Sequence, residues 1–165
     1  MALERGLRPP AAPARFVLLA LVMLGAGGCA KHAVDAVKDM RARACAGDAA
    51  GFFAHVDRDG LVQAARAGAE KKAEASLAEL DPAAQAAARQ KLPDRVERVA
   101  QTSVSDTFTT WRYEIGRGPA GDLCRMSIME SSEADHTADV HVKDPADFHW
   151  KMARRGDRWL LVRVD

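Results

Sequence analysis

Apolar and polar side chains alternate through the C-terminal part of the chain, and this pattern limits the fold more than any other. Segments 138–142, 148–153 and 159–164 each carry large apolar side chains at every second position. Alternation with a period of two is typical of strands that bury one face. We therefore predict three consecutive antiparallel strands, whose inner face forms the wall against which the preceding helices pack.

The alternation also predicts how the first two of these strands pair. A shift of one residue would move every apolar side chain to the wrong face, so the register must be even. We expect Val142 opposite Phe148 and Val140 opposite Trp150, joined by a five-residue turn. All four side chains then face the core.

The same register places polar pairs on the opposite face. His141 lies opposite His149, and Asp139 lies opposite Lys151. Two cross-strand imidazoles can hold a metal ion. No third fixed ligand accompanies them, so we interpret this face as exposed polar surface and predict neither a metal site nor a cofactor.

The register of the last strand has two solutions, which depend on the length of the Arg-Gly-Asp turn before it. A three-residue turn directs Leu160 and Val162 inward, whereas a two-residue turn directs Trp159 and Leu161 inward. Trp150 faces the core in both cases, so we predict that it is the most costly side chain to remove.

The chain ahead of these strands is rich in Ala, which favours helices. We expect a helix from Asp35 to about Cys45, a second one capped by Asp59, a charged helix over 70–80 and one from Pro82 to about Leu92. Pro93 is expected to end the last of these.

Two further segments complete the expected order. Residues 103–115 fit both a helix and a strand, and the Gly that follows them favours the helix. Residues 123–130 alternate roughly and are expected to form a first strand. The prediction is an α+β fold, with N-terminal helices packed on a C-terminal antiparallel sheet of three or four strands.

The first 28 residues are typical of a secretion signal. A basic head with three Arg precedes an apolar run over 16–24, which is nine residues long. A membrane-spanning helix needs about 20. Small residues at 26–28 stand before a cysteine, as a signal peptidase requires.

The end of this signal resembles the bacterial lipobox. The resemblance implies cleavage before Cys29 and lipid on its sulfur and new amino terminus. Ala26 departs from the pattern, since the family usually has Leu there, and an ordinary signal cut at Ala26 or Gly28 would leave Cys29 as a thiol in a soluble secreted or periplasmic protein. Ala30 follows the cysteine, and by resemblance to enterobacterial lipoproteins this predicts the outer membrane.

Cleavage after residue 28 leaves 137 of the 165 residues, enough for one domain with a core. The removed part holds three of the 24 basic and one of the 23 acidic residues, so 21 and 22 remain. Such a balanced charge does not suggest a nucleic-acid partner, and we predict none. We expect a signal peptide over 1–28, a lipidated tether over 29–34 and a single α+β domain over 35–165.

Two cysteines remain beyond the anchor. Cys45 falls at the end of the first expected helix and Cys124 at the start of the first expected strand. In an oxidising envelope compartment they can form a disulfide, and they can equally stay as two buried thiols. The sequence leaves both outcomes open.

Two patterns carry a family likeness. The first expected helix ends in Ala-Gly-Asp-Ala-Ala-Gly-Phe over 46–52, and the chain closes with a strand pair containing Phe148-His-Trp-Lys-Met and Gly156-Asp-Arg-Trp-Leu-Leu-Val. Together they resemble small bacterial lipoproteins of unknown function built on the nuclear-transport-factor-like fold. The resemblance implies a cone-like α+β domain. The chain departs from that pattern by its long Ala-rich middle over 61–99.

The sequence contains no Ser-His-Asp order, CxxC pair, phosphate loop or paired-carboxylate motif. We therefore expect a non-catalytic lipoprotein that is held to the membrane by its lipid and binds an envelope protein, a lipid or a small apolar ligand. The alternative is an enzyme like the cone-fold isomerases, dehydratases and cyclases. Its pocket would use His55 with Asp57 or Asp106.

Overall fold

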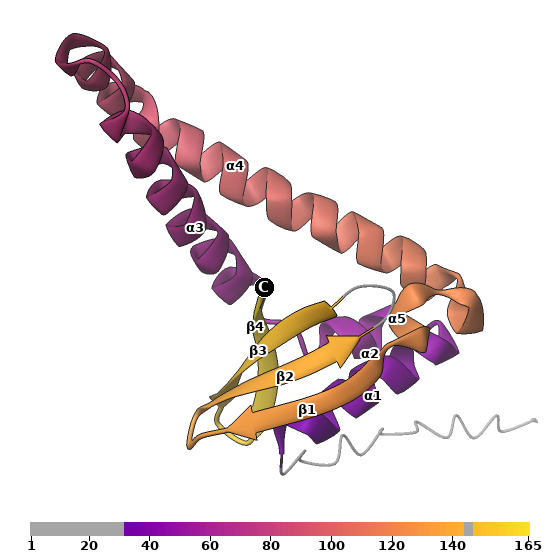
Figure 1. Cartoon of the computed structure of the whole chain (residues 1–165). Coiled ribbons are helices and arrows are strands. Elements are labelled where there is room, and N and C mark those ends of the chain that lie inside the picture. The colour runs from indigo at the N-terminus through magenta and orange to yellow at the C-terminus, as the bar shows by residue number, and fades with distance from the viewer. Residues whose placement is uncertain (1–31, 144–146) are drawn as a thin grey trace, which may run out of the picture.

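A computed structural model describes residues 32–143 and 147–165 (Figure 1). The predicted signal peptide and the predicted lipid site at Cys29 lie outside the described residues. The first helix begins at Ala33, two residues earlier than expected.

Helices come first along the chain and the sheet comes last, so the α+β prediction is confirmed. The sheet is antiparallel, with the strand order β1-β2-β3-β4. The cone shape stays a prediction. The elements are α1 (Ala33–Ala46), α2 (Ala49–Phe53), α3 (Arg58–Ala78), α4 (Pro82–Gly116), the 3-10 turn η1 (Gly118–Ala120), α5 (Asp122–Arg125), β1 (Ser127–Glu133), β2 (Thr137–Lys143), β3 (Asp147–Arg155) and β4 (Arg158–Val164).

Aspartates begin three of the helices. Asp48, Asp57 and Asp81 each accept a hydrogen bond from a backbone N–H in the first turn of α2, α3 and α4, at 2.8 to 3.0 Å. Each such cap satisfies an amide that the helix itself leaves unpaired. The expected cap at Asp59 is wrong, because Asp57 stands one residue before α3 and Asp59 is inside its first turn.

Helix α4 continues through Pro93, so the break predicted there is also wrong. A proline removes one backbone hydrogen bond, but the contacts of α4 with α3 continue on the far side, where Val96 and Ala100 are buried. Residues 103–115 belong to the same helix, which confirms the helical choice for that segment.

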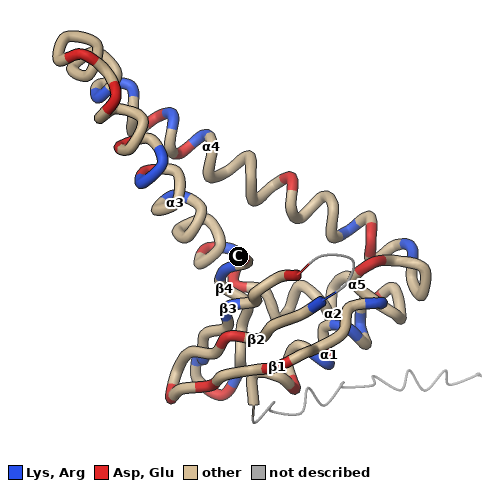
Figure 2. Tube along the Cα trace, viewed as in Figure 1, with Lys and Arg blue, Asp and Glu red and all other residues tan. Residues whose placement is uncertain are grey.

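Helices α3 and α4 form an antiparallel hairpin that projects away from the sheet (Figure 1). We call its outer half, residues 66–100, the arm. Helix α4 has 35 residues and is therefore about 52 Å long. Only Leu77, Val96 and Ala100 are buried in the arm, and positive and negative side chains are mixed along it (Figure 2).

The core lies between α1 and one face of the sheet, which we call the inner face. Apolar side chains of α1 recur at helical spacing and are fully buried: Ala33, Ala36, Val37, Met40 and Ala44. The inner face contributes Val140, Val142, Trp150, Met152, Trp159 and Leu161, all 3% exposed or less. Phe52 of α2 packs edge-on against Trp111 and Trp150. Because the described residues bury their own apolar side chains in one continuous cluster, we expect this part to fold without residues 1–28.

The strand register agrees with the sequence pattern. Val142 pairs with Phe148 and Val140 with Trp150, as predicted. For the last strand the two-residue turn is the correct solution, with Gly156 at a φ of 63°. Trp159 and Leu161 consequently face inward.

The first strand is the one that the sequence placed wrongly. It spans Ser127–Glu133 instead of 123–130, because residues 122–125 form the short helix α5. β1 is an edge strand whose side chains are mostly exposed. Its sequence therefore lacks the clear alternation that burial of one face imposes on β2 and β3.

Candidate functional site

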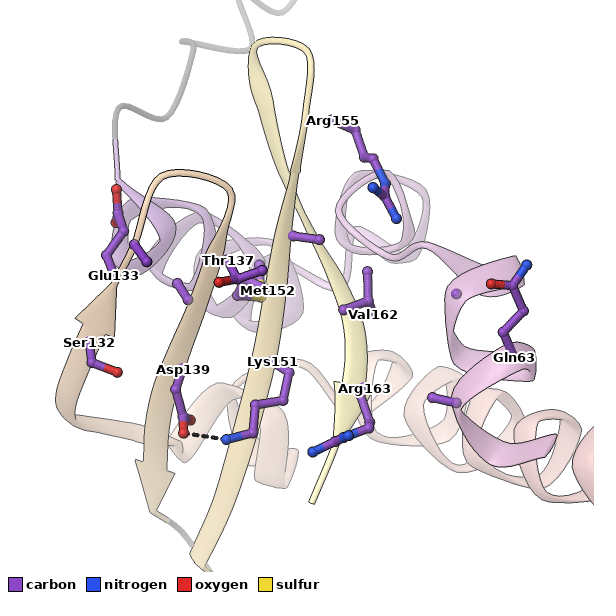
Figure 3. Close-up of a pocket in the computed structure, with 15 residues that line it drawn as sticks. Gln63, Ser132, Glu133, Thr137, Asp139, Lys151, Met152, Arg155, Val162 and Arg163 are labelled. Carbon is purple, nitrogen blue, oxygen red and sulfur yellow. Dashed lines mark hydrogen bonds and ion pairs between the residues drawn. The ribbon is translucent and has the colours of Figure 1, made fainter. Parts of the chain in front are cut away.

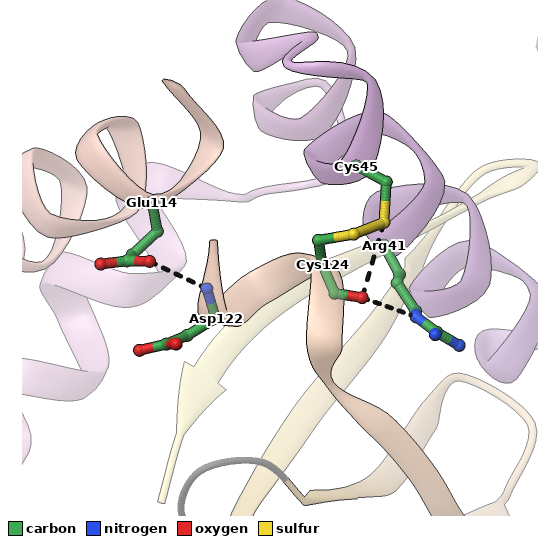
Figure 4. The surroundings of a disulfide bond; sticks show 5 residues. All are labelled: Arg41, Cys45, Glu114, Asp122 and Cys124. Atoms are coloured by element: carbon green, nitrogen blue, oxygen red, sulfur yellow. Dashed lines mark hydrogen bonds between the residues drawn. A yellow bond between two sulfur atoms is a disulfide. The ribbon is translucent and has the colours of Figure 1, made fainter. Parts of the chain in front are cut away.

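A disulfide joins Cys45 of α1 to Cys124 of α5 (Figure 4). The two α-carbons are 4.6 Å apart, within the range that a disulfide needs. Arg41 Nε donates a hydrogen bond to the carbonyl of Cys124 at 3.0 Å. Cys124 thus lies in a helical turn, not at the start of a strand, and the bond fixes α5 against the end of α1.

A carboxylate holds α5 from its other side. Glu114 Oε2 accepts the backbone N–H of Asp122 at 2.8 Å (Figure 4), and Arg117 pairs with the same carboxylate at 3.0 Å. The backbone bond, followed by Arg117, lowers the pKa of Glu114. Gly121 is required nearby, because a Cβ there would lie 2.1 Å from the Glu114 carbonyl oxygen.

An apolar groove of about 570 Å³ opens between α4, α5 and the inner face of the sheet. Helix α4 supplies one wall, with side chains from a single helical face. The whole groove is lined by Asp106, Thr107, Thr110, Trp111, Glu114, Asp122, Leu123, Met126, Val142, Phe148, Trp150 and Val164. We call this the α4 groove.

The base of the α4 groove is part of the hydrophobic core. Met126, Val142 and Trp150 are 2 to 3% exposed. The Trp111 and Trp150 rings lie 6.3 Å apart, centroid to centroid. Phe148 is on the same parity as Trp150 but remains 38% exposed. The helical layer therefore leaves one end of the inner face uncovered, and this opening is the α4 groove.

A second hollow of about 750 Å³, lined by both polar and apolar residues, lies on the outer face of the sheet beside the start of α3 (Figure 3). Its base includes a row of directly opposed residues, Ser132, Asp139, Lys151 and Arg163, one from each strand. Lys151 Nζ pairs with Asp139. This contact, followed by the one with His149, lowers the pKa of Asp139.

Beside this row, the rings of His141 and His149 stack with centroids 4.8 Å apart and 4° between their planes. His141 Nε2 lies 3.2 Å from Asp147, and His149 Nδ1 lies 3.0 Å from Asp139. Each imidazole thus already has a carboxylate partner. In residues 32–143 and 147–165, no group of three or more His, Cys, Asp or Glu side chains is arranged to hold a metal ion.

The structure does not bring His55, Asp57 and Asp106 into one pocket. His55 Nε2 lies 2.8 Å from Asp39 of α1, and Asp57 is occupied as the cap of α3. Asp106 is exposed on α4 and lines the α4 groove. The partner of His55 was missed because nothing in the sequence links position 39 to position 55.

Sequence reasoning also missed the α4 groove. Phe148 and Trp150 were correctly placed on the inner face, but Leu123 and Met126 were assigned to a strand. The pattern could show which face is apolar. It could not show how much of that face the helices cover.

Among the helices that the structure describes, none is both long and apolar enough to span a membrane. The chain matches no protein-family model, and the searches of curated proteins and of solved structures found no significant match to it.

Proposed function

We propose that this protein is a lipid-anchored protein of the bacterial envelope and that its domain binds a small apolar ligand in the α4 groove. The observation that carries the proposal is the uncovered end of the inner face, where Phe148 stays exposed beside buried Trp150. A ligand in the groove would remove this aromatic surface from water, which is favourable at about 25 cal/mol per Å².

The shape and lining of the groove support this use. Its volume of about 570 Å³ falls within the roughly 300–1,000 Å³ that small-molecule sites occupy. Apolar side chains form the base and polar ones the rim, which is the arrangement that lets a site hold an apolar ligand and still orient it. The disulfide and the Glu114 contact with α5 hold one wall in place without a ligand.

The lipobox-like signal supports the anchor. If Cys29 carries the lipid, residues 29–32 connect the lipid to Ala33, where α1 begins. A stretch of four residues reaches at most about 14 Å. The domain would therefore stay next to the lipid headgroups, and the residue after the cysteine favours the outer membrane, with the domain facing the periplasm. We also propose that the protein is related to the nuclear-transport-factor-like lipoproteins. The order of the elements, with helices first and the sheet last, supports this relation.

The structure gives less support to the enzyme alternative. An acid-base site needs its groups within hydrogen-bond reach of one substrate. His55, Asp57 and Asp106 are in three separate environments. The His55–Asp39 pair borders neither the α4 groove nor the outer hollow.

The binding proposal is tested with the chain from residue 29 carrying Cys29→Ser, titrated with the neutral fluorophore N-phenyl-1-naphthylamine. We expect saturable binding that Phe148→Ala weakens several-fold, because Phe148 lines the groove and is exposed enough to be replaced without unfolding. Tyr113→Ala is the matched control, since Tyr113 is 66% exposed on α4 and outside the groove lining. Absence of binding, or equal effects of both variants, would contradict the proposal.

The anchor is tested by intact mass spectrometry of the membrane fraction from cells that express the full chain. We expect a chain that starts at Cys29 and carries the mass of its acyl groups. The Cys29→Ser chain should lack that mass and leave the lipoprotein fraction. A wild-type protein that is cut elsewhere and recovered in the soluble periplasmic fraction would show that the anchor assignment is wrong.

A further inference from the structure

The charges at the rim of the α4 groove are of one sign. Asp106, Glu114 and Asp122 line it, and among the described lining residues none carries a positive charge. Glu114 is already neutralised, because Arg117 pairs with its carboxylate and the Asp122 N–H donates to it. The remaining negative charge comes from Asp106 and Asp122.

These two aspartates come from different elements, Asp106 from α4 and Asp122 from α5. Neither forms an ion pair with a side chain of the described residues. The charge of Asp122 contributes to the raised pKa of Arg117, so part of it is balanced at a distance. Asp106 is exposed on α4 and lines the groove, and Trp111 lies between it and Glu114 along the helix.

The apolar part of the groove favours the same kind of ligand. Trp111, Phe148 and Trp150 contribute three aromatic rings to it. Aromatic rings attract cations through the negative charge on their faces, and of these three rings Phe148 is the one that stays 38% exposed and can meet a charged head. An anion such as a fatty-acid carboxylate would instead meet two carboxylates of its own sign at the rim, which repel it.

We propose that the ligand of the α4 groove is an amphiphile with a positively charged head, an alkylamine or a quaternary ammonium compound. Its alkyl chain lies over Trp150, Val142 and Met126, and its head lies at the rim, beside Asp106. This inference rests on the proposed binding function and adds the charge of the ligand.

The test compares three amphiphiles that share a decyl chain: decyltrimethylammonium, decyl maltoside and decanoate. Each is titrated below its micelle concentration into the Cys29→Ser chain from residue 29, followed by tryptophan fluorescence and calorimetry. We expect the cation to bind about five- to tenfold more tightly than the neutral compound, and the anion to bind most weakly. The preference should shrink as salt is added, since the rim is open to solvent.

Two variants locate the preference. Asp106→Asn removes the charge with little change of size and should reduce the advantage of the cation at least about threefold, while binding of decyl maltoside stays unchanged. Asp94→Asn is the control, because it removes the same charge from α4 outside the groove lining, and it should change neither affinity.

The outcomes separate the two proposals. If all three compounds bind equally, if the anion binds best, or if Asp106→Asn and Asp94→Asn act alike, the charge preference is wrong and the binding function stands. If none of the three binds, the binding function itself fails and the preference fails with it.

Discussion

His149 and Trp150 are neighbours on β3, and they show how differently the two faces of one sheet are used. The Trp150 side chain is 3% exposed and packs against Phe52 and Trp111. The His149 side chain is 48% exposed and touches a carboxylate and another imidazole. Burial of apolar side chains therefore stabilises the inner face. The outer face carries paired charges that remain in contact with water.

The two faces of the sheet are therefore expected to contribute differently to stability and to ligand binding. Burial of large apolar side chains contributes most of the free energy of folding, and exposed ion pairs contribute little. The inner face has to serve both purposes, because its covered part is the core and its uncovered end is the α4 groove. Changes on the outer face should affect stability only slightly and leave binding unchanged.

The largest effect is expected for Trp150→Ala. Removing this buried ring should lower the free energy of unfolding by about 3–5 kcal/mol, through lost burial and the cavity left behind. Chemical denaturation followed by circular dichroism measures it, provided the variant folds. If it does not fold, Trp150→Phe should still lose a measurable part of the stability. A Trp150→Ala protein that melts within a few degrees of wild type would show that the inner face is assigned wrongly.

The next largest effect is expected for loss of the disulfide, which holds the helical layer on the inner face. Cys45 and Cys124 are 79 residues apart. Opening a loop of this length gives the unfolded chain entropy worth about 4.5 kcal/mol, and measured losses are typically about 2–4 kcal/mol. We expect the double variant Cys45→Ala, Cys124→Ala to melt at a lower temperature by a corresponding amount. Dithiothreitol should then destabilise the wild type and leave this variant unaffected.

A smaller effect is expected for Asp139→Asn on the outer face. Its pKa lies below the ordinary value of 3.8, chiefly because of Lys151. A lowered folded pKa means that the carboxylate stabilises the fold above its ordinary pKa and loses this contribution as the pH falls through the lowered value. The variant should therefore be less stable than wild type by about 0.5–1 kcal/mol at pH 7, and the difference should shrink as the pH falls below 3.8 and through the lowered pKa. A difference that grows in acid would contradict this account.

The smallest effect is expected for His141→Ala. Its imidazole is partly exposed, lies 3.2 Å from Asp147 and 3.9 Å from Glu130, and stacks on His149. We expect the free energy of unfolding to change by less than about 0.5 kcal/mol. Ligand binding in the α4 groove should be unchanged, because His141 is on the opposite face of the sheet. A large loss in either measurement would show that the two faces are not independent.

The sheet was the part of the fold that could be predicted best. The pairing of β2 with β3 followed from alternation alone, because only one register buries Val140 and Val142 together with Trp150. Helix starts were predicted less well. Asp57 and Asp59 are both good caps, and only the hydrogen bond to Gly60 N decides between them.

The sequence by itself determined the class of the fold and the inner face of β2 and β3, because these depend on side-chain chemistry and a period of two. Tertiary structure alone decided that α4 continues through Pro93, that His55 meets Asp39 and that Cys45 bonds Cys124. It also decided the α4 groove, since a groove depends on where a helical layer ends above a sheet. That boundary is set by how distant segments pack, and no local pattern of residues records it.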